Sequence, residues 1–551
     1  MSNDSHSKKN NSKSTVALTP LSEGQQSPPN ADRAEVSRSW GETLQLFISR
    51  EIITMLFLGF SAGIPILLIF SSLSLWLGEA GVERSTVTYF SWAALGYSFK
   101  FLWAPLVDRL PIPGLTTRLG RRRGWLLFAQ MLVIIALIWM GSTNPAIGDF
   151  QLTMMAFATV MLGFSSATQD SVIDAYRIEV VEIDIQSLMA STYIAGYRIG
   201  MIVSGAGALV LAQSLGTTPE AYDYSAWQWT YYSMALVMFV GVTTTLCMHE
   251  PKLDQPTYHG FSARQYLRFL LLFVIAICVF VVCFNLLSQP FGEYKSQLGQ
   301  AFGNPILANT LLEFARLLCC IGAAALSLWL VSKSSIYERE LVNVAFVQPI
   351  LEFFTRYGVK SSLVILVFVG FYRISDIVLG VIAIVFYQDM GFSKIEIAGA
   401  SKTFGLIMTI LGGFLGGVLS AKYGVMRILV AGAVLTMLTN LLFVLLANVG
   451  YNVTLLYWVI SADNLTGGLA STAFIAYLAS LVNISFTASQ YAIFSSLMTL
   501  IPKTIGGYSG TIVDSVGYQN FFLFASALGL PVLLVLYFVS KIEVCKQMKV
   551  A

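Results

Sequence analysis

The chain has 551 residues, of which 56% are hydrophobic and only 11% are charged, whereas an ordinary soluble domain carries about 25% charged residues. A single soluble core could not enclose so much apolar surface, and the net charge of +3 is too small to indicate a nucleic-acid partner. The composition therefore predicts an all-α polytopic membrane protein.

The first segment differs from the rest of the chain. Residues 1–45 are rich in Ser, Asn, Lys and Pro and contain no apolar run of the kind found in a signal peptide. Such a composition cannot bury enough apolar surface to fold. We expect a disordered cytoplasmic tail.

Six apolar runs then follow, each close to the 20 or so residues that cross a bilayer as a helix. They form the N-terminal six-helix bundle that we predict over residues 46–248. The runs lie at about 52–77, 87–108, 124–141, 151–173, 188–213 and 228–247.

The middle of the chain, residues 249–360, combines polar linkers with two extra spans near 265–287 and 306–331. It ends in an amphipathic stretch over 335–357, which is typical of a helix lying at the membrane surface. A C-terminal six-helix bundle follows over 361–540, and a short cytoplasmic tail over 541–551, giving about 14 transmembrane helices in all. The last six spans lie at about 362–387, 394–419, 427–447, 454–482, 488–512 and 518–540.

Basic residues mark one side of the membrane. They cluster between the second and third spans (118–123), between the eighth and ninth (333–360) and at the end of the chain (541–549). Because loops rich in Lys and Arg stay in the cytoplasm, we expect both termini to be cytoplasmic.

A repeated turn follows the second span of each bundle. The first copy reads Ala104-Pro-Leu-Val-Asp-Arg109 and continues at Gly120-Arg-Arg-Arg-Gly124, and the second runs from Gly417 to Gly424. This turn resembles the loop pattern of the major facilitator superfamily, whose two halves are related by an axis along the membrane normal. The resemblance implies a gating role for Asp108 and Arg109, which would tie neighbouring helix ends together in one state of alternating access. The alternative is that they only anchor the loop at the interface.

A narrower resemblance extends over residues 52–540. Its motifs include Leu58-Gly-Phe-Ser-Ala-Gly-Ile-Pro65, Phe99-Lys-Phe-Leu-Trp-Ala-Pro-Leu-Val-Asp-Arg109, Ser166-Ala-Thr-Gln-Asp-Ser-Val-Ile-Asp-Ala-Tyr-Arg177 and Tyr372-Arg-Ile-Ser-Asp376. These are similar to the AmpG muropeptide permease family.

The resemblance implies a permease of the bacterial inner membrane. Its cargo would be GlcNAc-1,6-anhydro-MurNAc, with or without the stem peptide, imported with protons for peptidoglycan recycling and linked to β-lactamase induction. Relatives with the same skeleton carry other cargo, so the alternative is a permease for another anionic solute, such as a peptide, a siderophore or an acyl-CoA.

Charged residues within the spans are functional candidates, because a charge at membrane depth costs several kcal/mol unless it is paired or faces water. At about 1.5 Å per residue, six of them lie roughly 12 to 18 Å deep. We expect these six to line a central cavity: Lys100, Arg198, Arg373, Asp376, Lys402 and Asp463.

Four acids are candidates for proton coupling. Asp170 and Asp174 share one helix face with Arg177, so they form either a proton site, for which Asp170 is the deeper, or an ion pair that closes a gate together with Arg177. Asp463 precedes Gly467 and Gly468, which permit close helix contact. Asp376 is spaced to pair with Arg373 within one helix.

Substrate contacts are expected from residues of three kinds. Lys100, Arg198, Arg373 and Lys402 make the cavity more cationic than acidic, which favours an anionic substrate. Amides that could hydrogen-bond sugars or peptides are Gln169 and Gln490, and rings that could stack on a sugar are Tyr97 and Trp103, although ordinary packing is the alternative for the rings.

The energy source follows from what the sequence lacks. It contains no G-x-x-x-x-G-K-[ST] nucleotide loop, so we expect no cofactor and no metal, with the proton gradient as the energy source. Its three histidines, His6, His249 and His259, lie in polar segments, which argues against a membrane-embedded enzyme. One chain of this fold should suffice as a monomer.

Overall fold

The computed structural model describes residues 45–83, 90, 95–182, 185–218, 221–251, 263–287, 343–506 and 509–542, together with single residues between 290 and 331. The chain divides into Met1–Ser37 and Arg38–Ala551, and all described residues lie in the second unit. The predicted N-terminal tail, most of the second extra span and most of the C-terminal tail lie outside the described residues.

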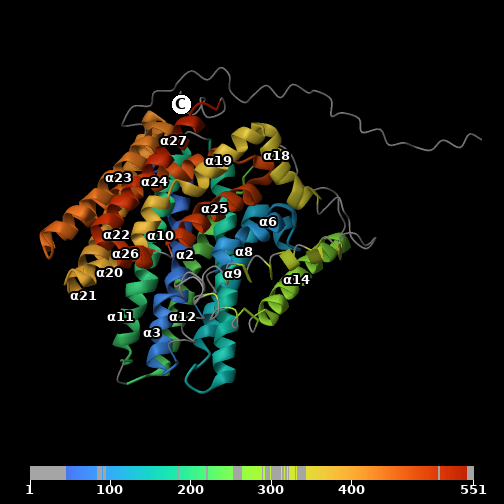
Figure 1. The fold of residues 1–551 in the computed structure, drawn as a ribbon. Coiled ribbons are helices and arrows are strands. Elements are labelled where there is room, and N and C mark those ends of the chain that lie inside the picture. The colour runs from blue at the N-terminus through green and yellow to red at the C-terminus, as the bar shows by residue number, and fades with distance from the viewer. Residues whose placement is uncertain are drawn as a thin grey trace, which may run out of the picture. The chain divides into compact units, whose positions relative to one another are not determined.

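The first half of the chain is helical throughout its described spans (Figure 1). Its elements are α2 (Arg50–Ile69), α3 (Ser71–Glu79), α5 (Leu95–Phe99), η2 (Lys100–Leu102), α6 (Ala104–Arg109), α7 (Leu115–Leu119), α8 (Arg121–Gly141), α9 (Asp149–Val180), α10 (Gln186–Ile202), η4 (Val203–Gly207), α11 (Ala208–Ser214), α12 (Tyr224–Val237) and α13 (Phe239–Cys247).

The middle and the second half continue in the same way. Their elements are α14 (Ala263–Leu286), η5 (Asn343–Val347), α18 (Gln348–Tyr357), α19 (Val359–Phe371), α20 (Ile374–Asp389), α21 (Lys394–Ile397), η6 (Ala398–Phe404), α22 (Gly405–Tyr423), α23 (Val425–Val449), α24 (Val453–Ser480), η7 (Ile484–Phe486), α25 (Thr487–Gly506), α26 (Ser509–Ala527) and α27 (Gly529–Val539). The predicted amphipathic helix is helical over its described part, residues 343–357.

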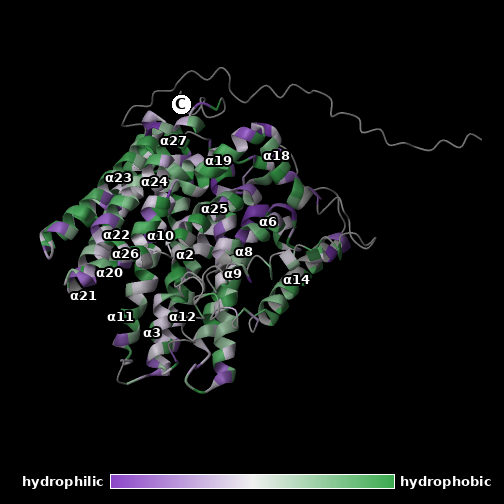
Figure 2. Cartoon of the chain, viewed as in Figure 1, coloured by the Kyte–Doolittle hydropathy of each residue, from purple (hydrophilic) through white to green (hydrophobic). Residues whose placement is uncertain are grey.

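Ten helices among the described residues are long and apolar enough to cross a membrane. They correspond to ten of the predicted spans, and α24 is a further helix of 28 residues at the position of another. Figure 2 shows hydrophobic residues along these helices and hydrophilic ones at α6.

The second predicted span is not one continuous helix over its described part. The chain passes from α5 through the 3-10 segment η2 into α6, which carries Pro105 in its first turn. Proline has no N–H to donate and its ring collides with the preceding turn. The prediction of an unbroken helix over 87–108 is therefore wrong near Trp103.

Glycines bring two helix pairs into backbone contact. A Cβ added at Gly59 would lie 2.3 Å from the carbonyl oxygen of Tyr193, and one at Gly196 would lie 2.0 Å from that of Leu56, so α2 and α10 touch along their backbones. The same device joins α22 to α24, where a Cβ at Gly412 would lie 1.9 Å from the carbonyl oxygen of Leu465. Small residues permit such close packing between membrane helices.

Candidate functional site

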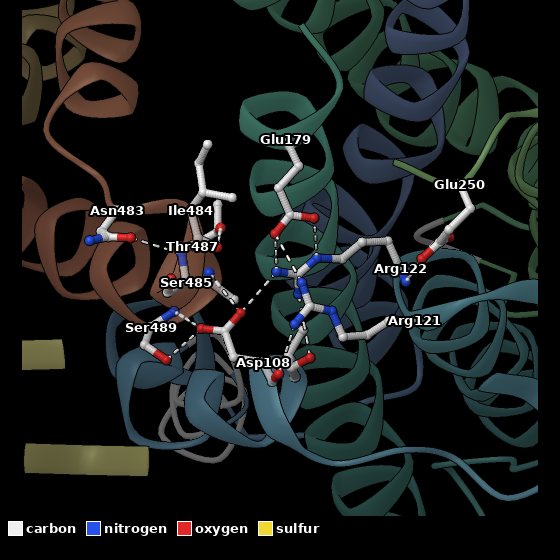
Figure 3. A network of polar contacts seen from close by, with 12 residues as sticks. Asp108, Arg121, Arg122, Glu179, Glu250, Asn483, Ile484, Ser485, Thr487 and Ser489 are labelled. Carbon is white, nitrogen blue, oxygen red and sulfur yellow. Dashed lines mark hydrogen bonds and ion pairs between the residues drawn. The ribbon is translucent and has the colours of Figure 1, made fainter. Parts of the chain in front are cut away.

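A buried ion-pair network lies where the first half meets the second. Asp108 at the end of α6 accepts a hydrogen bond from Arg122 Nη2 at 2.9 Å, and both side chains are 1% exposed. Arg122 also donates to Glu179 on α9, from Nε at 2.9 Å and from Nη2 over a shorter contact. Arg121 donates to Glu179 at 3.2 Å, so two arginines and two acids close one network (Figure 3).

The carboxylate of Asp108 also reaches the first turn of α25, in the second half (Figure 3). It accepts hydrogen bonds from Ala488 N at 3.1 Å, from Ser489 N at 2.8 Å and from Ser489 Oγ at 2.6 Å. The first N–H groups of a helix lack partners within the helix, and the helix dipole favours an anion there. Asp108 therefore fastens α6 to α25 across 381 residues of sequence.

The other two predicted gating residues reach the same segment. The Arg109 guanidinium lies 5.0 Å from the ring centre of Phe486, just before α25, and that of Arg177 lies 5.2 Å from the ring of Tyr491. Arg177 is fully buried and donates to Asp174 at 3.4 Å. These contacts agree with the predicted tie between helix ends, whose gating function stays a prediction.

Sequence reasoning missed three members of this network, namely Glu179, Glu250 and Ser489. Glu250 accepts hydrogen bonds from the backbone N–H groups of Arg122 at 2.7 Å and Arg123 at 3.0 Å, at the start of α8. Burial raises the pKa of Glu250, and these N–H groups act in the opposite direction. The available signal was the row of arginines over 121–123, which needs acids from elsewhere once it is buried.

A second buried pair lies deeper in the first half. Lys100 Nζ lies 3.2 Å from Asp174 Oδ2, with side chains 9% and 11% exposed. The sequence counted Lys100 toward a cationic cavity, and the structure corrects this, because Asp174 on α9, 74 residues away, pairs with it. Lys100 is therefore neutralised by the protein in this state.

Asp170 lies one turn before Asp174 and is buried. Its Oδ1 atom has no hydrogen-bond partner among the described residues. Asp170 is thus a buried acid that is only partly satisfied.

The predicted hydrogen-bonding and stacking residues of the first half are engaged with the protein. Gln169 donates to Ser61 Oγ at 3.1 Å and Trp103 Nε1 donates to Thr168 Oγ1 at 3.0 Å. The Tyr97 hydroxyl lies 2.5 Å from Ser166 Oγ. For Trp103, which also packs on the Phe164 ring at 4.6 Å, these contacts favour the packing alternative.

A third charged group lies between the halves. Arg373 donates to Asp376 Oδ2 at 2.5 Å, which confirms their predicted pairing, and both side chains are 29% exposed. Arg198 on α10 is half-buried, and its Nη1 lies 3.9 Å from Met201 Sδ. Asp463 on α24 is half-buried.

Gln490 lies apart from these charges. Its Nε2 donates to Pro349 O at 2.8 Å and to Glu352 Oε2 at 2.7 Å, and its Oε1 accepts from Asn483 N at 2.7 Å. The amide therefore joins α18 to the start of α25, a role that we favour over substrate contact. Lys402 belongs to η6, and its side chain lies outside the described part of the structure.

Two hollows among the described residues are apolar. The larger, about 540 Å³, lies between η6, α22 and α24 and includes Tyr457 and Trp458, whose ring is largely exposed. Neither hollow contains any of the six deep charges predicted to line a central cavity. An apolar hollow beside an exposed tryptophan is the surface expected to meet lipid.

Comparison with known proteins identifies the family. A family model of the Major Facilitator Superfamily matches residues 57–372. A putative transporter AmpG 4 of Rickettsia conorii is 30% identical over 496 residues, covering 90% of this chain and 98% of the relative. The chain belongs to the AmpG family of the major facilitator superfamily.

Other similarities agree with this family. The anhydromuropeptide permease of Escherichia coli is 27% identical over 505 residues, covering 92% of this chain and 81% of the permease. Among solved structures, the proton:xylose symporter XylE has a TM-score of 0.56 at 12% identity, covering 91% of this chain and 98% of that one, and FucP has a TM-score of 0.54 at 10% identity, covering 89% and 99%. At such low identity these likenesses show the fold alone.

The AmpG-family fold makes this chain a multi-pass membrane transporter and not an enzyme.

Proposed function

We propose that this transporter imports cell-wall muropeptides across the bacterial inner membrane together with protons. The cargo is supported by the E. coli relative, which is named an anhydromuropeptide permease. A muropeptide carries carboxylates, so it suits a protein whose deep cations include Arg198 and Arg373. A role in peptidoglycan recycling follows from that cargo.

The observation that carries proton coupling is the state of Asp170. Its carboxylate is buried, one oxygen lacks a partner among the described residues, and the Lys100–Asp174 pair lies beside it. An acid held in this way can bind and release a proton when its surroundings change. One proton entering through about 100 mV supplies roughly 2.3 kcal/mol, enough for about a fifty-fold gradient of cargo.

The network around Asp108 supplies the gate in this proposal. It joins the halves at the end that carries Arg121 and Arg122, which basic loops assign to the cytoplasm, so both termini would be cytoplasmic. With that end closed, cargo would enter from the opposite side and leave after the Asp108 contacts to α25 break.

The test is uptake of radiolabelled GlcNAc-anhydro-MurNAc-tripeptide into right-side-out vesicles, with and without a protonophore. We expect uptake that the protonophore abolishes and that Asp170→Asn reduces at least tenfold. Asp149→Asn is the matched control, because Asp149 begins the same helix and is exposed. Correctly inserted protein that takes up no muropeptide would show that the cargo is another anionic solute.

A further inference from the structure

The contacts between α10 and α22 set the level of Arg198. Ser187 Oγ donates to Gly417 O at 3.0 Å, and Ile194 lies over Gly413, where an added Cβ would be 3.8 Å from Ile194 Cγ2. Each turn forward along α10 thus meets an earlier turn of α22. One further turn brings Arg198 to the level of Thr409.

Thr409 connects that level to α24. Its Oγ1 donates to Asn464 Oδ1 at 3.0 Å, and Asn464 follows Asp463 directly. Arg198 from the first half therefore lies at the depth of Asp463 from the second. Asn440 Nδ2 on α23 donates to Ser375 Oγ at 2.7 Å, and a Cβ added at Gly432 on α23 would lie 2.9 Å from Ala470 Cβ on α24. Counting back along α24 from Ala470 brings Asp463 level with Asn440, so Arg373, two residues before Ser375, lies at the same depth as Asp463 and Arg198.

The charges in this group are incompletely matched. Two guanidinium groups from opposite halves repel each other, and the one ion pair among these four residues joins Arg373 to Asp376. Asp463 is half-buried and pairs with neither arginine. A further carboxylate placed between the arginines would relieve their repulsion.

The group is also accessible, since the side chains of Arg373 and Asp376 are 29% exposed. A guanidinium presents a planar fork of donors that matches a carboxylate in a bidentate manner. Asp376 Oδ2 already accepts from Arg373 Nη2, so this carboxylate stands where a ligand carboxylate would bind.

We propose that Arg198 and Arg373 form a carboxylate subsite that spans the two halves, in which a substrate carboxylate displaces Asp376 from Arg373. The subsite rests on the proposed function for its cargo and names the part of the substrate that is recognised. A ligand bound to both arginines links the halves, so binding and relative movement of the halves are coupled. Lys100 is not part of it, because Asp174 neutralises that ammonium.

The experiment compares two probes on purified protein in nanodiscs. One is GlcNAc-anhydro-MurNAc-tripeptide, and the other is the same compound with its carboxyl groups converted to carboxamides. We expect the wild type to bind the acid at least tenfold more tightly than the amide. Arg198→Gln and Arg373→Gln should each bind the acid about tenfold more weakly while binding the amide as before.

Asp376→Asn gives the opposite result, because it removes the internal competitor, so affinity for the acid should rise several-fold. Arg427→Gln is the control, since Arg427 is an exposed arginine on α23 outside this group. Arg198→Lys and Arg373→Lys keep the charge, and partial recovery of acid binding would show that the glutamine variants remain folded.

Either arginine variant that keeps the full preference for the acid overturns the subsite. If the wild type binds neither probe, the proposed cargo is wrong. In that case cross-linking tests whether the two arginines lie in one site. A bis-maleimide of about 10 Å should join Arg198→Cys to Arg373→Cys if the arginines share one site, and absence of this cross-link in labelled protein overturns the proposal.

Discussion

Two charged regions of this transporter differ in how exposed their side chains are. The Asp108–Arg122 pair is 1% exposed on both sides, and Lys100–Asp174 is 9% and 11% exposed, whereas Arg373 and Asp376 are each 29% exposed. Removing one partner of a buried pair strands a charge, while an exposed pair exchanges with water at little cost. The two buried pairs, Asp108–Arg122 and Lys100–Asp174, therefore stabilise one state of the transporter. The more exposed Arg373–Asp376 pair is free to exchange its partner.

The largest effect should come from Asp108→Ala. It leaves two buried arginines, Arg121 and Arg122, to share Glu179, and removes the acceptor for Ala488 N and both donors of Ser489. We expect a loss of about 3–5 kcal/mol in the state that joins α6 to α25. Thermal unfolding in detergent measures this, together with maleimide labelling of a cysteine at Ala488, which is 1% exposed and keeps its N–H bond to Asp108. Unchanged labelling would contradict the distinction between the buried pairs and the exposed pair.

Lys100→Gln should have the next largest effect, because Asp174 would keep only Arg177 as a cationic partner. The expected loss is about 2–3 kcal/mol of stability. The double variant Lys100→Gln/Asp174→Asn should recover part of it, since the carboxylate left without Lys100 is then neutral and the asparagine Oδ1 can still accept from Arg177 Nη2. A double variant less stable than the sum of the two single variants would contradict this explanation.

Ser489→Ala tests one bond of the network. It removes the 2.6 Å hydrogen bond from Ser489 Oγ to Asp108 and leaves the two backbone N–H bonds intact. Because the acceptor is charged, we expect a loss of about 1.5–3 kcal/mol, less than for Asp108→Ala. The same unfolding and labelling measurements apply. An effect equal to that of Asp108→Ala would mean that the Ser489 hydroxyl alone accounts for the stabilising contact between α6 and α25.

The smallest stability change should follow Asp376→Asn. Its partner Arg373 is 29% exposed, so the loss should stay below about 1 kcal/mol in thermal unfolding. The contrast with Lys100→Gln sharpens the comparison, because both changes remove one charge from a pair about 3 Å apart or closer. A loss as large as that of Lys100→Gln would make the Arg373–Asp376 pair structural.

Local patterns in the sequence were sufficient for much of the fold. Apolar runs such as 124–141 predicted membrane helices, because the bilayer demands about 20 apolar residues in one stretch. The pairing of Arg373 with Asp376 also followed from sequence, since residues three apart on a helix are neighbours. Proline at 105, by contrast, was read as part of a continuous span, although it begins a new helix.

What the amino-acid sequence determined by itself is therefore the number and rough position of most described helices and the pairs within them. Only the tertiary structure decided that Lys100 meets Asp174 and that Asp108 meets Ser489, 381 residues away. The physical reason is that a buried charge requires a partner but does not specify which helix supplies it. That choice depends on how the helices pack, and here glycines such as Gly59 and Gly412 let the backbones touch and set the register of the charges.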